Sequence, residues 1–363
     1  MSHDVDVSVI IPIYNGVPYL EQCINSLKKQ NHNLLKIEIL FIDDVSEDNS
    51  VEYIKSLKLK NIKILNSQTN KGPSAARNIG IKNALGEYIF FQDVDDIIEN
   101  NALEVLYSKA KHYESEFVFS DHKRIEDFKD QRGNRYDFNE ETVFNKERII
   151  QAMKNEFDNP NTGHLGLFGC NGRLIKRSLL LKKNILFDES LKWNEDKTFA
   201  WLVLSYVEKA IYVKNKLYSF YVNPNVQTAG IVGLSSNFSL ENIKLISKHI
   251  DQSLENKGFN QEERDKLTQK TLIFHAIKVL ISFSIRLLLN KINFKKGVQL
   301  RKKMIKDIIF DDDIKSAIKN YKPSKNESFF LPKAIHYRSI FFLEFFCNLR
   351  AKKIIKMRRS GKV

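Results

Sequence analysis

The chain has 363 residues, of which 42% are hydrophobic, and its 58 Lys and Arg against 44 Asp and Glu give a formal net charge of +14. This length predicts two domains, and the hydrophobic content excludes a disordered chain. The cysteines at positions 23, 170 and 347 are too widely spaced for a disulfide framework or zinc ribbon, which favours a reducing compartment. Because there is no signal-peptide pattern and no run of about 18 uncharged apolar residues, we expect a cytoplasmic protein without a membrane span.

The positive charge is concentrated in the last third of the chain. Residues 285–306 hold eight Lys and Arg and no acid, and residues 334–363 hold eight with a single acid, Glu344. These two segments carry +8 and +7, which leaves −1 for the rest. The basic surplus therefore needs an explanation separate from that of the first 230 residues.

The first 120 residues alternate short apolar runs with helical patterns. The apolar runs are continuous and predict strands at 7–13, 37–42, 62–65, 88–91 and 116–120. The segments between them predict helices at 18–30, 51–57, 73–85 and 101–113. This order is typical of a mostly parallel sheet covered by helices on both faces.

The patterns beyond residue 120 are weaker. Residues 121–160 are polar with weak periodicity, and we interpret them as an insertion crossing the edge of the sheet. A helix is predicted at 199–207, and strands at 210–213 and 218–222. From about residue 236 the pattern is helical, and residues 272–288 show the single apolar stripe of a packed amphipathic helix.

These patterns predict an α/β domain with a mostly parallel central sheet, followed by a smaller, mainly α-helical basic domain. We place the boundary near residues 224–236. The first domain is then 1–230, with halves 1–120 and 121–230, and the second is 231–363.

Polar segments end the first strands or precede the next helices, at 12–15 (PIYN), 43–48 (DDVSED), 70–78 (NKGPSAARN) and 93–96 (DVDD). Ligands of parallel α/β sheets bind at the carboxyl ends of the strands, so these segments are expected to converge. The 93–96 segment could hold a hard cation such as Mg²⁺ or Mn²⁺, or its aspartates could only cap a helix. The 70–78 segment could bind an anion at a helix N-terminus, or form a capped surface helix.

Taken together, in this order and spacing, the four segments resemble the family 2 glycosyltransferases, which have the GT-A fold. Residues 7–15, 39–50, 70–80 and 88–96 are similar to the family's opening strand and base-stacking turn, its acidic turn, its NxGxxxARNxG segment and its DxD strand. The resemblance is strong over about 120 residues and extends weakly to residue 222.

The resemblance implies that this chain binds a nucleoside diphosphate sugar with Mn²⁺ or Mg²⁺. Tyr14 would stack on the base, Asp44 would bind the uracil edge, and Asp95 would hold the metal at the diphosphate. Asp93 would bind the ribose or the metal. The implied donor-binding residues are Pro12, Tyr14, Asn15, Asp44, Asn70, Arg77 and Asp93. Where the family often has Gly, this chain has Val45, and a β-branched residue disfavours positive φ, so the turn could be altered.

The acidic pair Glu195-Asp196 resembles the family's ED motif, whose aspartate deprotonates the acceptor hydroxyl. On this resemblance Asp196 is the general base and Glu195 its neighbour or an acceptor contact. An acidic pair that only stabilises a helix N-terminus is the alternative. The segment after the motif lacks the family's diphosphate-gripping Arg or His. The possible substitutes stay open: Tyr221, Asn225, Thr228, Lys214 or Lys216.

The function implied is inverting, metal-dependent transfer from a UDP-sugar to a hydroxyl of a glycan or lipid-linked acceptor in bacterial surface polysaccharide synthesis. A nucleotidylyltransferase is disfavoured because residues 14–18 lack the required glycines and Arg. Nucleic-acid binding would suit the net charge, but no nucleic-acid motif is present and the charge lies outside the pocket-bearing domain. No nucleic-acid partner is therefore expected.

The C-terminus combines an aromatic-rich segment, 339–349, with the cationic segment 350–362. This combination suits an interfacial anchor on an anionic membrane surface, which would make the protein peripheral on the inner face of the cell membrane. Alternatively, the Phe cluster is buried in the helical domain and only a solvated basic tail remains.

Overall fold

The computed structural model describes residues 4–30, 34–126, 129–130, 141–158, 167–191, 193–222, 239–289, 294–323 and 327–359. The chain divides into two compact units. The first comprises Met1–Glu156, Thr162–Ser190 and Asn194–Asn223, and the second Phe157–Asn161, Leu191–Trp193 and Pro224–Val363. The finer domain limits at residues 120 and 230 stay a prediction.

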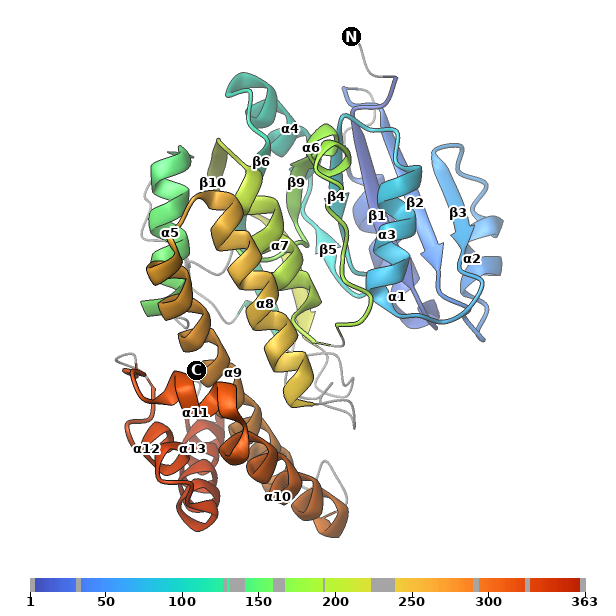
Figure 1. Cartoon of the computed structure of the whole chain (residues 1–363). Coiled ribbons are helices and arrows are strands. Elements are labelled where there is room, and N and C mark those ends of the chain that lie inside the picture. Colours follow the sequence, from blue (N-terminus) through green and yellow to red (C-terminus); the bar gives the residue numbers. More distant parts are fainter. Residues whose placement is uncertain are drawn as a thin grey trace. The chain divides into compact units, whose positions relative to one another are not determined.

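The first unit is built on one sheet, whose strands run in the order β3-β2-β1-β4-β9-β6-β10-β5, with β7 beside β6 and β8 beside β10. Figure 1 shows the run of strands from β3 to β10. The strands are β1 (Val7–Ile13), β2 (Ile37–Asp43), β3 (Ile62–Asn66), β4 (Tyr88–Phe91), β5 (Ile97–Ile98), β6 (Phe117–Glu126), β7 (Lys129–Asp130), β8 (Thr142–Phe144), β9 (Arg173–Lys176) and β10 (Ala210–Val222). The helices of this part of the chain are α1 (Val17–Lys28), α2 (Ser50–Ser56), α3 (Pro73–Asn83), α4 (Ala102–His112), α5 (Lys146–Asp158), α6 (Arg177–Lys182) and α7 (Glu195–Tyr206).

The sheet is mixed. Strands β3, β2, β1 and β4 are parallel, as predicted, and β10 is parallel to β6. Strand β9 lies between these two groups and is antiparallel to both β4 and β6. All residues of β2 and β4 are buried, and so are all but one of β1, which explains why their sequences are mostly apolar. The internal polar residues Ser8 and Glu38 are buried as a pair, with Ser8 Oγ donating to Glu38 Oε1 at 2.5 Å.

Residues 121–160, interpreted as an insertion crossing the edge of the sheet, form strands and a helix in the part that the structure describes. Strand β6 continues to Glu126, and its polar Asp121 is buried but accepts a hydrogen bond from Tyr212 Oη at 2.8 Å. Helix α5 follows, with Ile149 and Met153 buried one turn apart. Because buried Asp121 is polar and its partner Tyr212 is far away in the sequence, the sequence around residue 121 does not show the apolar run that predicts a strand.

The second unit is helical, as predicted. Its helices are α8 (Leu240–Lys257), α9 (Gln261–Leu288), α10 (Phe294–Phe310), α11 (Asp312–Ile318), α12 (Phe330–His336) and α13 (Ile340–Arg359). Its core gathers apolar side chains of α9, such as Ile273 and Leu280, with Ile305 of α10 and Leu343 of α13. Arg301 is also buried there and donates to Asn348 Oδ1 at 2.7 Å, so part of the basic surplus lies inside this unit.

Helix α9 is long and apolar enough to cross a membrane by length and composition alone. It is the one such helix among the described residues, and 61% of its most apolar window is buried inside the structure. A buried core helix passes the same test, and the packing of α9 is that of a core helix.

Candidate active site

The register of the parallel strands brings the predicted motifs to one edge of the sheet. Ile13 at the end of β1 pairs with Asp43 at the end of β2, and Asp44 N donates to Ile13 O at 2.8 Å. Gln92 N, just beyond β4, donates to Ile10 O at 3.1 Å. The segments that follow these strands therefore leave the sheet side by side, as predicted.

The turn after β1 presents an aromatic ring. The Tyr14 side chain is 51% exposed. Asn15 has a positive φ of 53°, and its Oδ1 accepts from Glu47 N at 2.8 Å, while its own N–H donates to Ser46 Oγ at 3.0 Å. Asn15 thus ties the turn after β1 to the acidic turn after β2. Pro12 lies within β1, paired with Ile42.

The acidic turn is tied in the same way to the start of α3. Asp44 is buried, and its two oxygens accept from Lys71 N at 3.2 Å and Gly72 N at 2.7 Å. Val45 has φ 65°, so it adopts the left-handed conformation that Gly would adopt more easily. The turn therefore has a residue in the left-handed conformation at position 45, although that residue is Val rather than Gly. Asn70, just before this loop contact, is exposed.

Arg77 on α3 connects two acidic segments. Its guanidinium is buried, donates through Nη2 to Asp93 Oδ1 at 2.7 Å, and places Nη1 3.9 Å from Glu195 Oε1. The Phe187 ring lies under it, 5.3 Å from Cζ to the ring centroid. Burial alone would lower the pKa of Arg77, but the nearby negative charges, Asp93 foremost, raise it.

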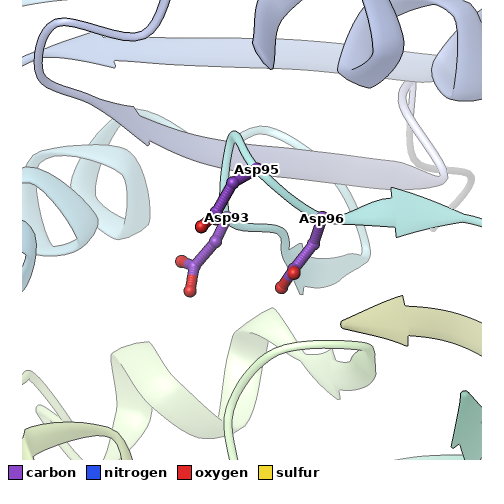
Figure 2. Close-up of side chains that lie close together, drawn as sticks. All are labelled: Asp93, Asp95 and Asp96. Atoms are coloured by element: carbon purple, nitrogen blue, oxygen red, sulfur yellow. The ribbon is translucent and has the colours of Figure 1, made fainter. Parts of the chain in front are cut away.

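Three carboxylates come from the turn after β4. Oxygens of Asp93, Asp95 and Asp96 lie within 4.8 Å of one another, and Figure 2 shows the three side chains leaving this one turn. Asp96 is buried and accepts from Tyr218 Oη at 2.7 Å and from Tyr221 N at 3.1 Å. Burial, together with the charges of Asp95 and Asp93, raises the pKa of Asp96 well above its usual value.

These residues fit a divalent metal ion. The cluster offers carboxylate oxygens only, which are the ligands that Mg²⁺ and Mn²⁺ prefer. Burial is the largest cause of the raised pKa of Asp96, and the repulsion from Asp95 and Asp93 that adds to it is excess negative charge that a bound cation would relieve. Asp96 serves more than the helix-capping role expected of it, because its hydrogen bonds attach the turn to β10.

The acidic pair stands at the first turn of α7, which begins at Glu195, four residues earlier than predicted. Burial and the charge of Asp196, partly offset by Arg77, raise the pKa of Glu195 to about 7. Phe199, one turn into α7, stacks on Phe187 with ring centroids 3.8 Å apart. The ring that supports Arg77 therefore also supports the helix that carries the acidic pair.

Two contacts at this site were not predicted. Asn171 Nδ2 donates to Asp93 Oδ2 at 2.6 Å, and Asp93 N donates to Tyr218 Oη at 3.2 Å. Gly172, the residue after Asn171, has φ 71°, and a Cβ at this position would come within 2.7 Å of the Tyr218 ring. The Asn171-Gly172 dipeptide, typical of a tight turn, was the available signal. Of the possible diphosphate contacts, Asn225 and Thr228 lie outside the described residues.

Residues 8–174 match the family model described as glycosyl transferase family 2. The uncharacterized glycosyltransferase EpsJ of Bacillus subtilis is 30% identical over 224 residues, which are 61% of this chain and 62% of EpsJ. The minor teichoic acid biosynthesis protein GgaB of the same organism is 28% identical over 287 residues, 76% of this chain and 29% of GgaB. This chain thus spans less than two thirds of the length of either relative.

Among solved structures, S. aureus TarS 1–349 in complex with UDP matches with a TM-score of 0.65 and 19% identity, over 98% of this chain and 92% of that one. The same TarS segment in complex with UDP-GlcNAc matches with a TM-score of 0.64. At this identity the likeness concerns the fold, and it confirms the predicted GT-A architecture with a helical C-terminal region. The family match and the relatives identify residues 8–174 as a glycosyl transferase family 2 segment.

Proposed function

We propose that this chain is an inverting, metal-dependent glycosyltransferase that moves a sugar from a UDP-sugar to a hydroxyl of a glycan or lipid-linked acceptor in bacterial surface polysaccharide synthesis. The observation that carries the proposal is one constellation at the sheet edge. The exposed ring of Tyr14, the carboxylates of Asp93 and Asp95, and the acidic pair at the start of α7 belong to it.

The donor half of the site suits a nucleotide. Tyr14 offers an exposed ring for base stacking, worth about 1–3 kcal/mol per base in other proteins. Asp44 fixes the loop before α3. Tyr14 and Asp44 directly follow Ile13 and Asp43, which are paired across β1 and β2. The TarS structures with UDP and UDP-GlcNAc support a uridine donor, and UDP-GlcNAc is the first sugar nucleotide to test.

Asp93 and Asp95 are the residues that would hold Mn²⁺ or Mg²⁺. Such a cation, when bound, supplies charge neutralisation for the departing diphosphate. Arg77 and Asn171 each hold one oxygen of Asp93, so its carboxylate is oriented before any ligand arrives.

Asp196 is the general base in this proposal. It removes the proton from the acceptor hydroxyl while that oxygen attacks the anomeric carbon, and the bond from this carbon to the diphosphate oxygen breaks. One displacement from the opposite face inverts the anomeric centre. We assign the base to Asp196 rather than Glu195 because Glu195 already faces Arg77.

The acceptor and the location complete the proposal. A glycan or lipid-linked hydroxyl is the acceptor, and the protein works in the cytoplasm, peripheral on the inner face of the membrane. The name of GgaB, a teichoic acid biosynthesis protein, supports an acceptor of the bacterial surface.

The test compares Asp196→Asn with Glu195→Gln and with Glu208→Gln, an exposed acid two residues beyond α7. UDP binding is measured by calorimetry in Mn²⁺, and transfer by release of UDP from UDP-GlcNAc with a bacterial glycan acceptor. We expect Asp196→Asn to abolish transfer and keep UDP affinity, Glu195→Gln to keep measurable transfer, and Glu208→Gln to match the wild type. Near-normal turnover of Asp196→Asn would overturn the base assignment, and no UDP binding by the wild type would overturn the function.

A further inference from the structure

The second unit exposes a cluster of aromatic side chains on α12 and α13. The exposed fractions of Phe341, Phe342 and Phe345 are 72%, 53% and 50%, and those of Phe329 and Phe330 are 56% and 54%. Monomeric proteins rarely expose that many large rings together unless the surface binds something. The alternative in which this Phe cluster is buried in the helical domain does not hold for these residues.

The rings form one continuous surface. Phe346 of α13 stacks on Phe330 of α12, with ring centroids 4.9 Å apart and an angle of 11° between the rings. Phe346 also stacks on Phe342 at 6.1 Å and meets Phe345 at 5.3 Å. We call Phe329, Phe330, Phe341, Phe342, Phe345 and Phe346 the aromatic surface.

Apart from Phe346, which is partly buried against the core, the aromatic surface is separate from the face of α13 that packs in the core. Leu343, Cys347 and Ala351 are fully buried, and their spacing of four residues marks the inner face of the helix. Phe341 and Phe345 lie on the opposite side of the helix. No rotation of α13 about its axis could therefore turn these two rings and the three buried residues toward the core at the same time. Helix α13 therefore has one face for its own core and a second apolar face turned outward.

Exposed cations border the aromatic surface. Lys333 Nζ lies 4.2 Å from the centroid of the Phe329 ring. Beyond Phe345, the outer face of α13 continues with Lys352, Lys353 and Lys356, all exposed. The one acid between residues 328 and 363 is Glu344, which is half-buried and pairs with Arg301 at 3.5 Å.

We infer that the aromatic surface and its bordering lysines dock on an anionic phospholipid bilayer. Aromatic rings enter the headgroup region while Lys side chains meet the lipid phosphates and carboxylates, and both features lie on one face of α13. A second copy of the chain is a poorer partner, because the one acid in residues 328–363 that could meet the lysines of a facing copy is Glu344, which already pairs with Arg301. The inference deepens the location given in the proposed function, because it names the surface and the class of lipid that would hold the protein there.

The test is flotation of the full-length protein with phosphatidylcholine vesicles, with and without phosphatidylserine. The aromatic variant is Phe341→Ser/Phe342→Ser/Phe345→Ser, and the cationic variant is Lys352→Gln/Lys353→Gln/Lys356→Gln. The matched control, Lys55→Gln/Lys58→Gln/Lys60→Gln, removes three exposed lysines from the first unit. Each variant is first checked for wild-type thermal unfolding, and Phe341→Ser alone replaces the aromatic variant if the latter unfolds.

We expect the wild type and the control to float with phosphatidylserine vesicles and to be released by salt. The cationic variant should bind about 100-fold more weakly, from about fivefold per lysine near an anionic surface. The aromatic variant should remain at the bottom of the gradient.

Wild-type protein that fails to float, or an aromatic variant that floats normally, would overturn the inference. The inference would also be overturned if sedimentation velocity showed a dimer for the wild type and a monomer for the aromatic variant, because the surface would then serve self-association. Flotation does not measure sugar transfer, so its failure would remove the proposed membrane location and leave the proposed transfer reaction standing.

Discussion

Arg77 donates to Asp93 at 2.7 Å, and the two residues differ sharply in exposure: 4% for the Arg77 side chain and 33% for that of Asp93. The buried guanidinium thus holds a carboxylate that remains accessible to a ligand. On its other side it lies 3.9 Å from Glu195. One buried cation consequently links the turn after β4 to the acidic pair at the start of α7.

We predict that Arg77→Met destabilises the fold by about 3–5 kcal/mol, because removing one partner of a buried ion pair leaves the acidic groups uncompensated. The free energy of unfolding in urea measures the loss. Lys71→Met, an exposed lysine in the loop before α3, should change it by less than about 0.5 kcal/mol. If Arg77 served chiefly to contact the nucleotide, Arg77→Met would instead keep its stability and lose only UDP affinity.

A second prediction concerns the pH dependence of stability. The pKa of Glu195 is about 7 in the folded chain, against 4.5 for an unperturbed Glu, so between these pH values the folded state binds more protons than the unfolded state. Stability contributed by this group is therefore present at low pH and lost as pH rises through 7. Glu195→Gln should be more stable than the wild type at pH 8 by about 1–3 kcal/mol and lose this advantage near pH 5. Thermal unfolding across this range checks it, with Glu208→Gln as control. A difference that did not depend on pH would contradict the raised pKa.

The elements that could be predicted are those in which a short stretch of sequence shows by itself whether its residues are buried. Strands β1, β2 and β4 are buried on both faces, so their sequences are mostly apolar, with Ser8 in β1 and Glu38 in β2 as internal exceptions. The ends of these strands, and hence the motifs that follow them, could be located from the sequence. Strand β9 was missed because it has only four residues, Arg173–Lys176, half of them cationic. Arg173 is nonetheless buried, and its Nη1 donates to the carbonyl oxygens of Asn171 and Gly172.

The contacts that complete the site depend on pairs far apart in sequence. Asn171 reaches Asp93 across 78 positions, and Tyr218 reaches Asp96 across 122. No periodicity or spacing encodes such pairs, because each depends on β9 and β10 entering the sheet beside β4 and β6. The contact of Arg77 with the distant Glu195 was unpredictable for the same reason. The motif that contains Arg77 nevertheless indicated that this residue belongs to the site.

A third prediction concerns Val45. A left-handed conformation costs an L-residue about 1–2 kcal/mol, whereas Gly loses only about 0.5–1 kcal/mol through its greater freedom in the unfolded chain. The Val45 side chain is 41% exposed, so little packing is lost on its removal. Val45→Gly should therefore raise the free energy of unfolding by about 0.5–1 kcal/mol. Glu47→Gly, in the same turn but without a positive φ, should lower it by a similar amount. Equal losses in both variants would show that the φ of 65° is not strained.

The last prediction concerns the metal. If Asp95 holds a divalent cation, UDP should bind wild-type protein at least about tenfold more tightly in Mn²⁺ than in the presence of a chelator. Asp95→Ala should bind UDP equally weakly under both conditions, since it lacks a ligand for the ion that meets the diphosphate. Glu21→Ala, an exposed acid on α1, should keep the full difference. Calorimetric titration with UDP measures all three proteins. A wild-type affinity that the chelator does not change would remove the metal from the proposed mechanism, whereas a metal response retained by Asp95→Ala would move the ligand role to Asp93. Asp93 is the residue that Arg77 and Asn171 already orient.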